Sequence, residues 1–365
     1  MDAREDSHAG SWYSDDKSTL SYQLDHWLQE VPDEIEGIGQ LPVPGARMII
    51  APHAGYAYSG RCAAFAYKAL DLSQAKRIFV VGPSHHHYFT TLALPEFTSY
   101  HTPLSDDPLP LDTEFIAKLR STKAVSRNGL ELQFTTMSRS VDEAEHSIEL
   151  HLPYIHRLLQ RQRPNQPTSQ YPPLVPILVG AVTESTEKAF GTLLAPYIDD
   201  PANAFVISSD FCHWGQRFRY TYYTSQAPNP GPSIPVSAPG LPQPGIDGDS
   251  VTDQMEMVSA GRSLKSRERI RSREPPIHES ISAVDIATMA AIATGEYARF
   301  STILKNTGNT VCGRHPIGVI MAGIEDIRKN EGEKGRFRFI RYDRSSHVIE
   351  VDDSSVSYVS AFTVL

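Results

Sequence analysis

The sequence has no excess of basic residues, few cysteines and no long hydrophobic run. Its 365 residues include 34 Lys and Arg against 43 Asp and Glu, which gives a formal net charge of -9. A protein that binds nucleic acid needs clustered basic residues to neutralise phosphates, and we find no such cluster with interleaved aromatic residues. Nucleic acid is therefore not expected as a partner.

Long apolar segments and paired cysteines are also scarce. The most apolar stretch, Ala283–Ala293, is interrupted by Asp285 and is much shorter than the roughly 20 residues that cross a bilayer, so no membrane span is expected. The first residues are polar and acidic, unlike a secretory signal or a transit peptide. Three cysteines without a CxxC pair fit a reducing compartment. We expect a cytoplasmic location, with the nucleus as a second one.

Short runs of β-branched and apolar residues alternate with segments of helical periodicity. The predicted strands are Met48–Ile50, Ile78–Val81, Val175–Val179 and Phe205–Ile207. The predicted helices between them are Gly60–Leu70, Thr113–Leu119, Ile148–Gln160 and Glu184–Tyr197. Such alternation is typical of a largely parallel sheet that is covered by helices.

The C-terminal part shows period-two alternation without helices between the runs. These runs are Arg336–Arg341, His347–Val351 and Val356–Val364, and we interpret them as antiparallel strands that extend the sheet. Two further helices are predicted at Ile281–Thr294 and Ile317–Lys329. The predicted fold is therefore α/β, a three-layer sandwich with a central mixed, mostly parallel sheet flanked by helices.

Two segments lack the apolar residues of folded elements. Residues 226–276 are rich in Pro, Gly, Ser and charge, and a smaller polar insertion covers about residues 33–45. A segment with little apolar surface cannot offset the entropy lost on ordering. We therefore predict one domain over residues 1–365, interrupted by a disordered surface insertion at 226–276.

Most histidines fall in six short motifs, and three of these directly follow a predicted strand. Those three are Ala51–Tyr56, Gly82–His86 and Ser208–Gly215. The other motifs are Ser7–Tyr13, Glu145–Tyr154 and Val311–Pro316. In an open α/β sheet, ligands bind at the carboxyl ends of the strands, where the loops converge. The pattern therefore predicts a functional site at that edge.

Taken together and in this order, the six motifs resemble the Memo family. The likeness covers almost the whole chain apart from the two insertions. It implies a fold similar to the class III extradiol dioxygenases, which are non-haem iron enzymes with an α/β sheet. It also implies a link to phosphotyrosine signalling and cell motility.

For the site, the resemblance implies a transition metal held by His53, His85 and Cys312. A non-haem ferrous site needs two imidazoles and one anionic ligand on one face of the metal. In the dioxygenases that third ligand is a carboxylate, whereas the matching position here is Cys312. The resemblance implies iron(II) as the expected metal. Because a thiolate is softer and more easily oxidised than a carboxylate, copper and zinc are the alternatives, and the replacement argues against extradiol ring cleavage.

The same resemblance matches His213 with the histidine that moves a proton during oxygen chemistry. Asp210, three residues earlier, can orient this histidine or bind a metal-bound water. A capping Asp with a packed His explains the pair equally well. We carry His213 and Asp210 forward as candidate catalytic residues.

Four more residues are expected next to the site. Glu145 and His146 stand where a helix begins and can hydrogen-bond a ligating imidazole, although an ordinary charged first turn is an equal alternative. Arg314 and His315 follow Cys312 across a predicted tight turn. The motif around Trp12 can form a wall over the crevice, with aromatic packing alone as the alternative.

Three functions stay open from the sequence. The first is a metal-dependent redox protein that acts on oxygen or on a small organic substrate of unknown identity. The second is a non-catalytic binding module that holds a phosphotyrosine-type peptide, with Arg314 and the strand-end loops binding the anion. A cysteine hydrolase built on Cys312 is least favoured, because no Gly-x-Ser-x-Gly accompanies it.

Overall fold

The centre of the protein is a parallel sheet of buried apolar strands. The computed structural model describes residues 2–245, 247–328 and 334–365. Four parallel strands lie in the order β12, β5, β13, β4. Their bounds are Leu174–Val179, Arg77–Pro83, Asn203–Ser208 and Met48–Ala51. They read as continuous apolar runs because helices cover both faces of a central parallel sheet, and all four predicted strands are confirmed.

Both edges of this sheet introduce antiparallel pairs, which makes the sheet mixed, as predicted. On one edge β6 (Leu92–Pro95) pairs antiparallel with β12, and β11 (Thr135–Met137) pairs parallel with β6. On the other edge the order continues from β4 through three antiparallel strands and a short branch. These are β19 (Ser355–Thr363), β18 (Arg338–Arg344), β16 (Val236–Ser237) and β14 (His213–Trp214).

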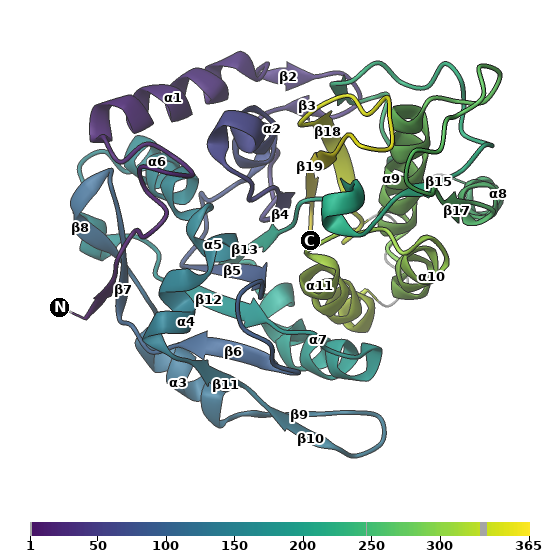
Figure 1. Cartoon of the computed structure of the whole chain (residues 1–365). Helices are drawn as coiled ribbons and strands as arrows, with labels where there is room; N and C mark the ends of the chain where they lie inside the picture. The colour runs from purple at the N-terminus through teal and green to yellow at the C-terminus, as the bar shows by residue number, and fades with distance from the viewer. Residues whose placement is uncertain (1, 246, 329–333) are drawn as a thin grey trace.

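Helices flank the sheet on both sides (Figure 1). The connections from β4 to β5 and from β12 to β13 run in opposite directions across the sheet, so right-handed crossovers place their helices on opposite faces. The first group is α1 (Lys17–Glu30), α2 (Tyr56–Ala69) and α6 (Leu152–Gln162). The second group is α7 (Glu184–Asp199) and α11 (Arg314–Ile327), with α3 (Thr113–Ser121) beside β6.

Smaller elements complete the chain. A three-stranded sheet joins β1 (Ala3–Arg4), β7 (Ser99–Thr102) and β8 (Ser105–Pro110). Short hairpins are β2 (Glu34–Ile35) with β3 (Gly39–Gln40), and β9 (Lys123–Val125) with β10 (Glu131–Gln133). The remaining helices before β12 are α4 (Arg139–Ala144) and α5 (His146–Glu149). None of the helices in the described part of the chain is long and apolar enough to cross a membrane.

Segment 226–276 differs from the predicted disordered insertion, because it contains helix α8 (Gly248–Ser259). The apolar side chains of Val251, Met255 and Val258 are buried and pack in one cluster with α9 (Ile277–Ala293). Their spacing of three and four residues places them on one face of a helix. The average composition of the whole segment does not reveal such a face. Nearby lie α10 (Tyr297–Thr307) and the strand pair β15 (Tyr222–Tyr223) and β17 (Arg262–Ser263).

The prediction of a strand at His347–Val351 is wrong. The backbone N–H groups of Ile349 and Glu350 both donate to the carboxylate of Asp353, each at 2.9 Å, which closes a turn. Val348 and Val351 are both buried against a small cluster around Trp214, but they lie three residues apart and Ile349 is exposed, so the segment lacks the period-two burial of a strand. The predicted helix Ile148–Gln160 is divided into α5 and α6, and the predicted end of the last helix, Lys329, lies outside the described residues.

Candidate metal centre

Three histidines from separate motifs meet beyond the carboxyl ends of the central strands. His53 follows β4, His85 follows β5 and His146 begins α5. One ring nitrogen of each lies within 4.8 Å of the others. The ring centroid of His85 is 5.1 Å from that of His53 and 4.4 Å from that of His146. The structure thus joins two of the predicted ligands with a residue that was predicted only as a neighbour.

Ser208, at the end of β13, fixes the tautomer of His53. Its hydroxyl donates to the carbonyl of Ser147 at 2.6 Å, so the oxygen accepts from the Nδ1–H of His53 at 2.5 Å. A proton on Nδ1 leaves the lone pair of Nε2 free. The buried His53 ring therefore presents the nitrogen form that binds metals.

Glu145 performs the same task for His85. One carboxylate oxygen lies 2.9 Å from Nδ1 of His85, and the other accepts from the backbone N–H of His85 at 2.7 Å. Burial alone would raise the pKa of Glu145, but the hydrogen bonds and charge of His85 outweigh it and lower this pKa to about 2. The ionised carboxylate accepts the Nδ1 proton and leaves Nε2 of His85 open.

Burial favours the neutral form of His53 and of His146. It lowers the pKa of His53 well below 6.5 and that of His146 to about 3, and the neighbouring imidazole of His85 adds to both effects. Nδ1 of His146 is buried and finds no hydrogen-bond partner among the described residues. Neutral imidazoles with free nitrogens are the form that coordinates transition metals.

Cys312, the third predicted ligand, contacts this group through His53. Its sulfur lies 3.2 Å from Nε2 of His53 and accepts from the backbone N–H of Asp210 at 3.1 Å. Burial, together with the charge of Asp210, raises the pKa of the thiol well above 9. The next residue is glycine because a Cβ there would lie 2.3 Å from the carbonyl oxygen of Ser208. This close approach brings the Cys312 turn against the end of β13.

Asp210 and His213 both lie near the imidazole group, but each is fixed by a different partner. Asp210 is buried and its carboxylate accepts from the backbone N–H of His53 at 2.9 Å, which holds the loop after β4. Nδ1 of His213 lies 2.9 Å from the carbonyl of Phe211 and 3.2 Å from that of Thr310. These carbonyls, rather than Asp210, orient the His213 ring and leave its Nε2 available.

Arg314 and His315 face another cavity. Nδ1 of His315 lies 2.5 Å from a carboxylate oxygen of Glu187 on α7, and Tyr297 on α10 donates to the other oxygen. Nε of Arg314 donates to Nε2 of His315 at 3.3 Å. These residues line a cavity of about 220 Å³ between α7, α10 and the start of α11. Helix α11 directs both side chains toward α7, so the structure places them at this cavity, and their expected position beside the metal site stays a prediction.

The N-terminal segment covers the imidazole group. The ring centroid of Trp12 lies 4.4 Å from that of His146. Fully buried Glu149 holds this segment, accepting from the backbone N–H of His8 at 2.8 Å and from the hydroxyl of Tyr13 at 2.7 Å, and pairing with Arg4 at 2.7 Å. The structure thus has the wall that the motif around Trp12 suggests.

Sequence reasoning missed Ser208 and Arg4. Ser208 is the first residue of one of the six motifs, so its place at a strand end was an available signal. Arg4 lies 138 residues from Asp142, with which it makes a buried ion pair of 3.0 Å, and nothing local in the sequence announces that contact.

Comparisons with known proteins agree with these motifs. The family model described as Memo-like protein matches residues 4–362. Protein MEMO1 of Xenopus laevis is 39% identical over 362 residues, covering 99% of this chain and 97% of that protein, and Protein MEMO1 of Homo sapiens is 38% identical with the same coverage. The MEMO1 family protein MHO1 of Saccharomyces cerevisiae is 35% identical over 372 residues, covering 100% of both. The solved structure of uncharacterized protein JW3007 from Escherichia coli K12 is 13% identical with a TM-score of 0.35, covering 86% of this chain and 98% of that chain.

Proposed function

This chain belongs to the Memo family, and on that premise we propose that it is an intracellular metal-binding redox protein related to the non-haem dioxygenases. His53, His85 and Cys312 hold the ion. Iron(II) is the proposed metal and copper or zinc are the alternatives. The proposed setting is the cytoplasm or nucleus, in signalling linked to cell motility.

The observation that carries this proposal is the pair of hydrogen bonds that fix the two imidazoles. Ser208 and Glu145 each engage Nδ1, which leaves Nε2 as the nitrogen that can bind a metal in both rings, and in His53 this nitrogen lies 3.2 Å from the sulfur of Cys312. Metal-binding histidines commonly donate their other ring N–H to an oxygen in this way. Buried histidines elsewhere in the chain, such as His156 with Thr102, also have a partner at Nδ1, so the feature that distinguishes His53 and His85 is the third imidazole that converges on the same point.

Cys312 is the proposed third ligand because of its distance from His53. A sulfur about 2.3 Å and a nitrogen about 2.1 Å from one ion lie about 3.1 to 3.6 Å apart for angles between octahedral and tetrahedral. The observed separation of Cys312 Sγ and His53 Nε2 is 3.2 Å. Since the pKa of the free thiol is raised by burial, metal binding has to release its proton. His146 is the alternative third ligand, because it belongs to the imidazole group.

The other residues prepare the site for chemistry. A bound iron or copper ion supplies one-electron redox chemistry with oxygen or a small organic substrate. Trp12 and the segment held by Glu149 limit the access of water to the imidazole group. His213, with Nδ1 held by two carbonyls, can accept or donate a proton at Nε2. The thiolate in place of a carboxylate argues against extradiol ring cleavage.

A peptide-binding module stays the alternative prediction. The cation that such a module would use, Arg314, extends from the Glu187 cavity and not from the imidazole group. Among the residues that the structure describes, no specific contact therefore favours this function over metal binding.

Metal analysis of protein purified without chelator tests the proposal. Wild type is compared with His53→Ala, Cys312→Ala and the control His315→Ala. We expect near-stoichiometric iron or copper in wild type and in the control, and loss of metal in the first two variants. Absence of metal from wild type, even after anaerobic loading with ferrous or cuprous ions, would overturn the proposal.

A further inference from the structure

A strongly basic segment, residues 262–274, runs from β17 toward α9. It includes six Lys or Arg and two Glu, whereas the formal net charge of the whole chain is -9. The segment belongs to the side of the molecule that carries α8, α9 and α10 (Figure 1). Such a concentration of positive charge in an acidic protein favours contact with an acidic surface.

Apolar side chains hold this segment in place. Leu264 and Ile277 are buried near its two ends, and the partly buried Ile270 packs against the same cluster. Between Leu264 and Ile277 the backbone forms turns and irregular structure, and the Lys and Arg side chains of this stretch are exposed. The apolar anchors therefore present a non-helical, basic stretch of chain to the solvent.

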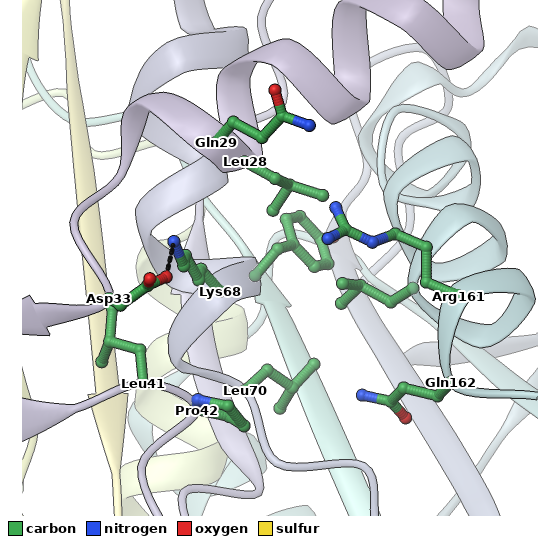
Figure 2. Close-up of a pocket in the computed structure, with 11 residues that line it drawn as sticks. Leu28, Gln29, Asp33, Leu41, Pro42, Lys68, Leu70, Arg161 and Gln162 are labelled. Carbon is green, nitrogen blue, oxygen red and sulfur yellow. Dashed lines mark ion pairs between the residues drawn. The ribbon is translucent and has the colours of Figure 1, made fainter.

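Four arginines of the segment lack acidic partners. Within the described part of the chain, no hydrogen bond or ion pair is made by the side chains of Arg267, Arg269, Arg271 and Arg273. Lys68 differs, because Figure 2 shows it paired with Asp33, at 2.7 Å, beside a hollow between α1, α2 and α6. The four guanidinium groups are therefore free to bind the carboxylates of another protein.

Ser272 lies among these arginines, in a turn. The backbone N–H of Glu274 donates to the carbonyl of Arg271 at 2.9 Å, and the carboxylate of Glu274 accepts from the backbone N–H of Arg271 at 3.1 Å. These two bonds close the turn without using the side chain of Ser272. Ser272 is exposed, and its hydroxyl makes no hydrogen bond with the described residues. The hydroxyl is therefore accessible to the active site of another protein.

The spacing of the arginines before Ser272 is typical of substrates of basophilic protein kinases. Such kinases select a serine or threonine by arginines at fixed earlier positions, which meet acidic residues of the kinase. Arg267 and Arg269 stand five and three residues before Ser272, and the sequence has this pair of arginines before a serine or threonine only here. Arg299 stands three residues before Thr302, but Thr302 is in helix α10 and Arg299 pairs with Glu296 at 2.8 Å. Pattern, exposure and unpaired arginines therefore coincide at Ser272.

We propose that Ser272 is phosphorylated by a basophilic protein kinase. Oγ of Ser272 forms a bond to the γ-phosphorus of ATP, the bond from that phosphorus to the bridging oxygen of the β-phosphate breaks, and ADP leaves. The hydroxyl proton passes to the catalytic aspartate of the kinase. The phosphate brings about -1.5 to -2 charges, which cancels about half of the positive excess of the segment. The site is independent of the metal centre, because it shares no residue with it.

Phosphorylation of the full, folded chain by ribosomal S6 kinase with ATP tests this proposal, since that kinase recognises arginines at these two positions. Mass spectrometry of the digested protein should locate the phosphate on Ser272, and Ser272→Ala should lose it. Arg269→Gln should lower kcat/KM for the transfer at least about tenfold, because a charge-assisted hydrogen bond to the kinase is lost. Circular dichroism confirms that each variant folds.

Two variants are matched controls. Arg273→Gln removes the same charge on the other side of Ser272, and Ser266→Ala removes an exposed serine that lacks arginine at the two earlier positions. Both variants should be phosphorylated on Ser272 at no less than the wild-type rate. Three results would overturn the proposal: no phosphate on Ser272 of wild type, equal kcat/KM in wild type and Arg269→Gln, or phosphate on Ser266 or Thr302 in place of Ser272.

Discussion

His85 and His315 are held in the same way but lie in different surroundings. Each ring has its Nδ1 next to a carboxylate, at 2.9 Å from Glu145 and 2.5 Å from Glu187. Beside His85 lie two further imidazoles, whereas Nε2 of His315 meets the guanidinium of Arg314. A cation at Nε2 opposes metal binding there. The comparison teaches that an imidazole held by a carboxylate is a candidate metal ligand only where further donors converge on the same point, as they do around His85.

Replacing His53 is expected to give the largest difference in metal affinity between the two histidine regions. His53→Ala should lower the affinity for ferrous or cuprous ions by more than about 100-fold, because loss of a ligand exceeds the 10- to 100-fold cost of losing its supporting partner. His315→Ala should leave this affinity unchanged. Anaerobic competition with a metal indicator measures both. A similar loss in the two variants would break the distinction between the regions.

Replacing the carboxylates of Glu145 and Glu187, which hold the two rings, should give a smaller difference in metal affinity in the same direction. Glu145→Gln keeps the shape of the side chain but removes the charge that strengthens His85 as a ligand, so metal affinity should fall about 10- to 100-fold. Glu187→Gln is the matched control and should not alter it. If Glu187→Gln weakened metal binding as much, His315 would belong to the metal site.

The pH dependence of stability in the metal-free protein tests the lowered pKa of Glu145. Its pKa falls from an ordinary value of 4.5 to about 2 on folding. The stabilisation is therefore fully present above pH 4.5 and is lost as the pH falls toward 2. As the pH falls between these values, the free energy of unfolding of wild type, measured with urea, should decrease by up to about 3 kcal/mol more than that of Glu145→Gln. Parallel curves for the two proteins would contradict this pKa.

The smallest effect is expected at the Glu187 cavity. Tyr297→Phe removes the hydroxyl that donates to Glu187. Loss of one hydrogen bond to a buried carboxylate should lower the free energy of unfolding by about 1 to 2 kcal/mol, without changing metal affinity. Thermal or urea unfolding and the indicator competition measure the two quantities. A change in metal affinity would mean that the two regions are coupled.

The sequence predicts the strands and the convergence of motifs because these depend on local pattern. Central parallel strands are continuous apolar runs, and the residues that follow them necessarily share one edge of the sheet. The prediction of a strand at His347–Val351 fails because its two buried valines, three residues apart, belong to a turn that packs against the cluster around Trp214. Helix α8 is missed because a single apolar face is hidden in a proline-rich segment.

The detailed contacts of the site depend on long-range packing and could not be predicted. The bond between Ser208 and His53 joins residues 155 apart in the chain, and the tautomer follows from it. His315 lies only three residues from Cys312, yet the start of α11 turns its ring toward Glu187 on α7. Closeness in the sequence indicated a shared site there, whereas the direction of the helix separates the two.

X-ray absorption spectroscopy at the metal edge tests the central claim, that His53, His85 and Cys312 hold one ion. The iron-loaded wild type should show nitrogen neighbours together with one sulfur at about 2.3 Å. The sulfur signal should disappear in Cys312→Ser and persist in His146→Ala. A wild-type spectrum with nitrogen and oxygen neighbours alone would contradict the claim for Cys312 and assign the third position to His146.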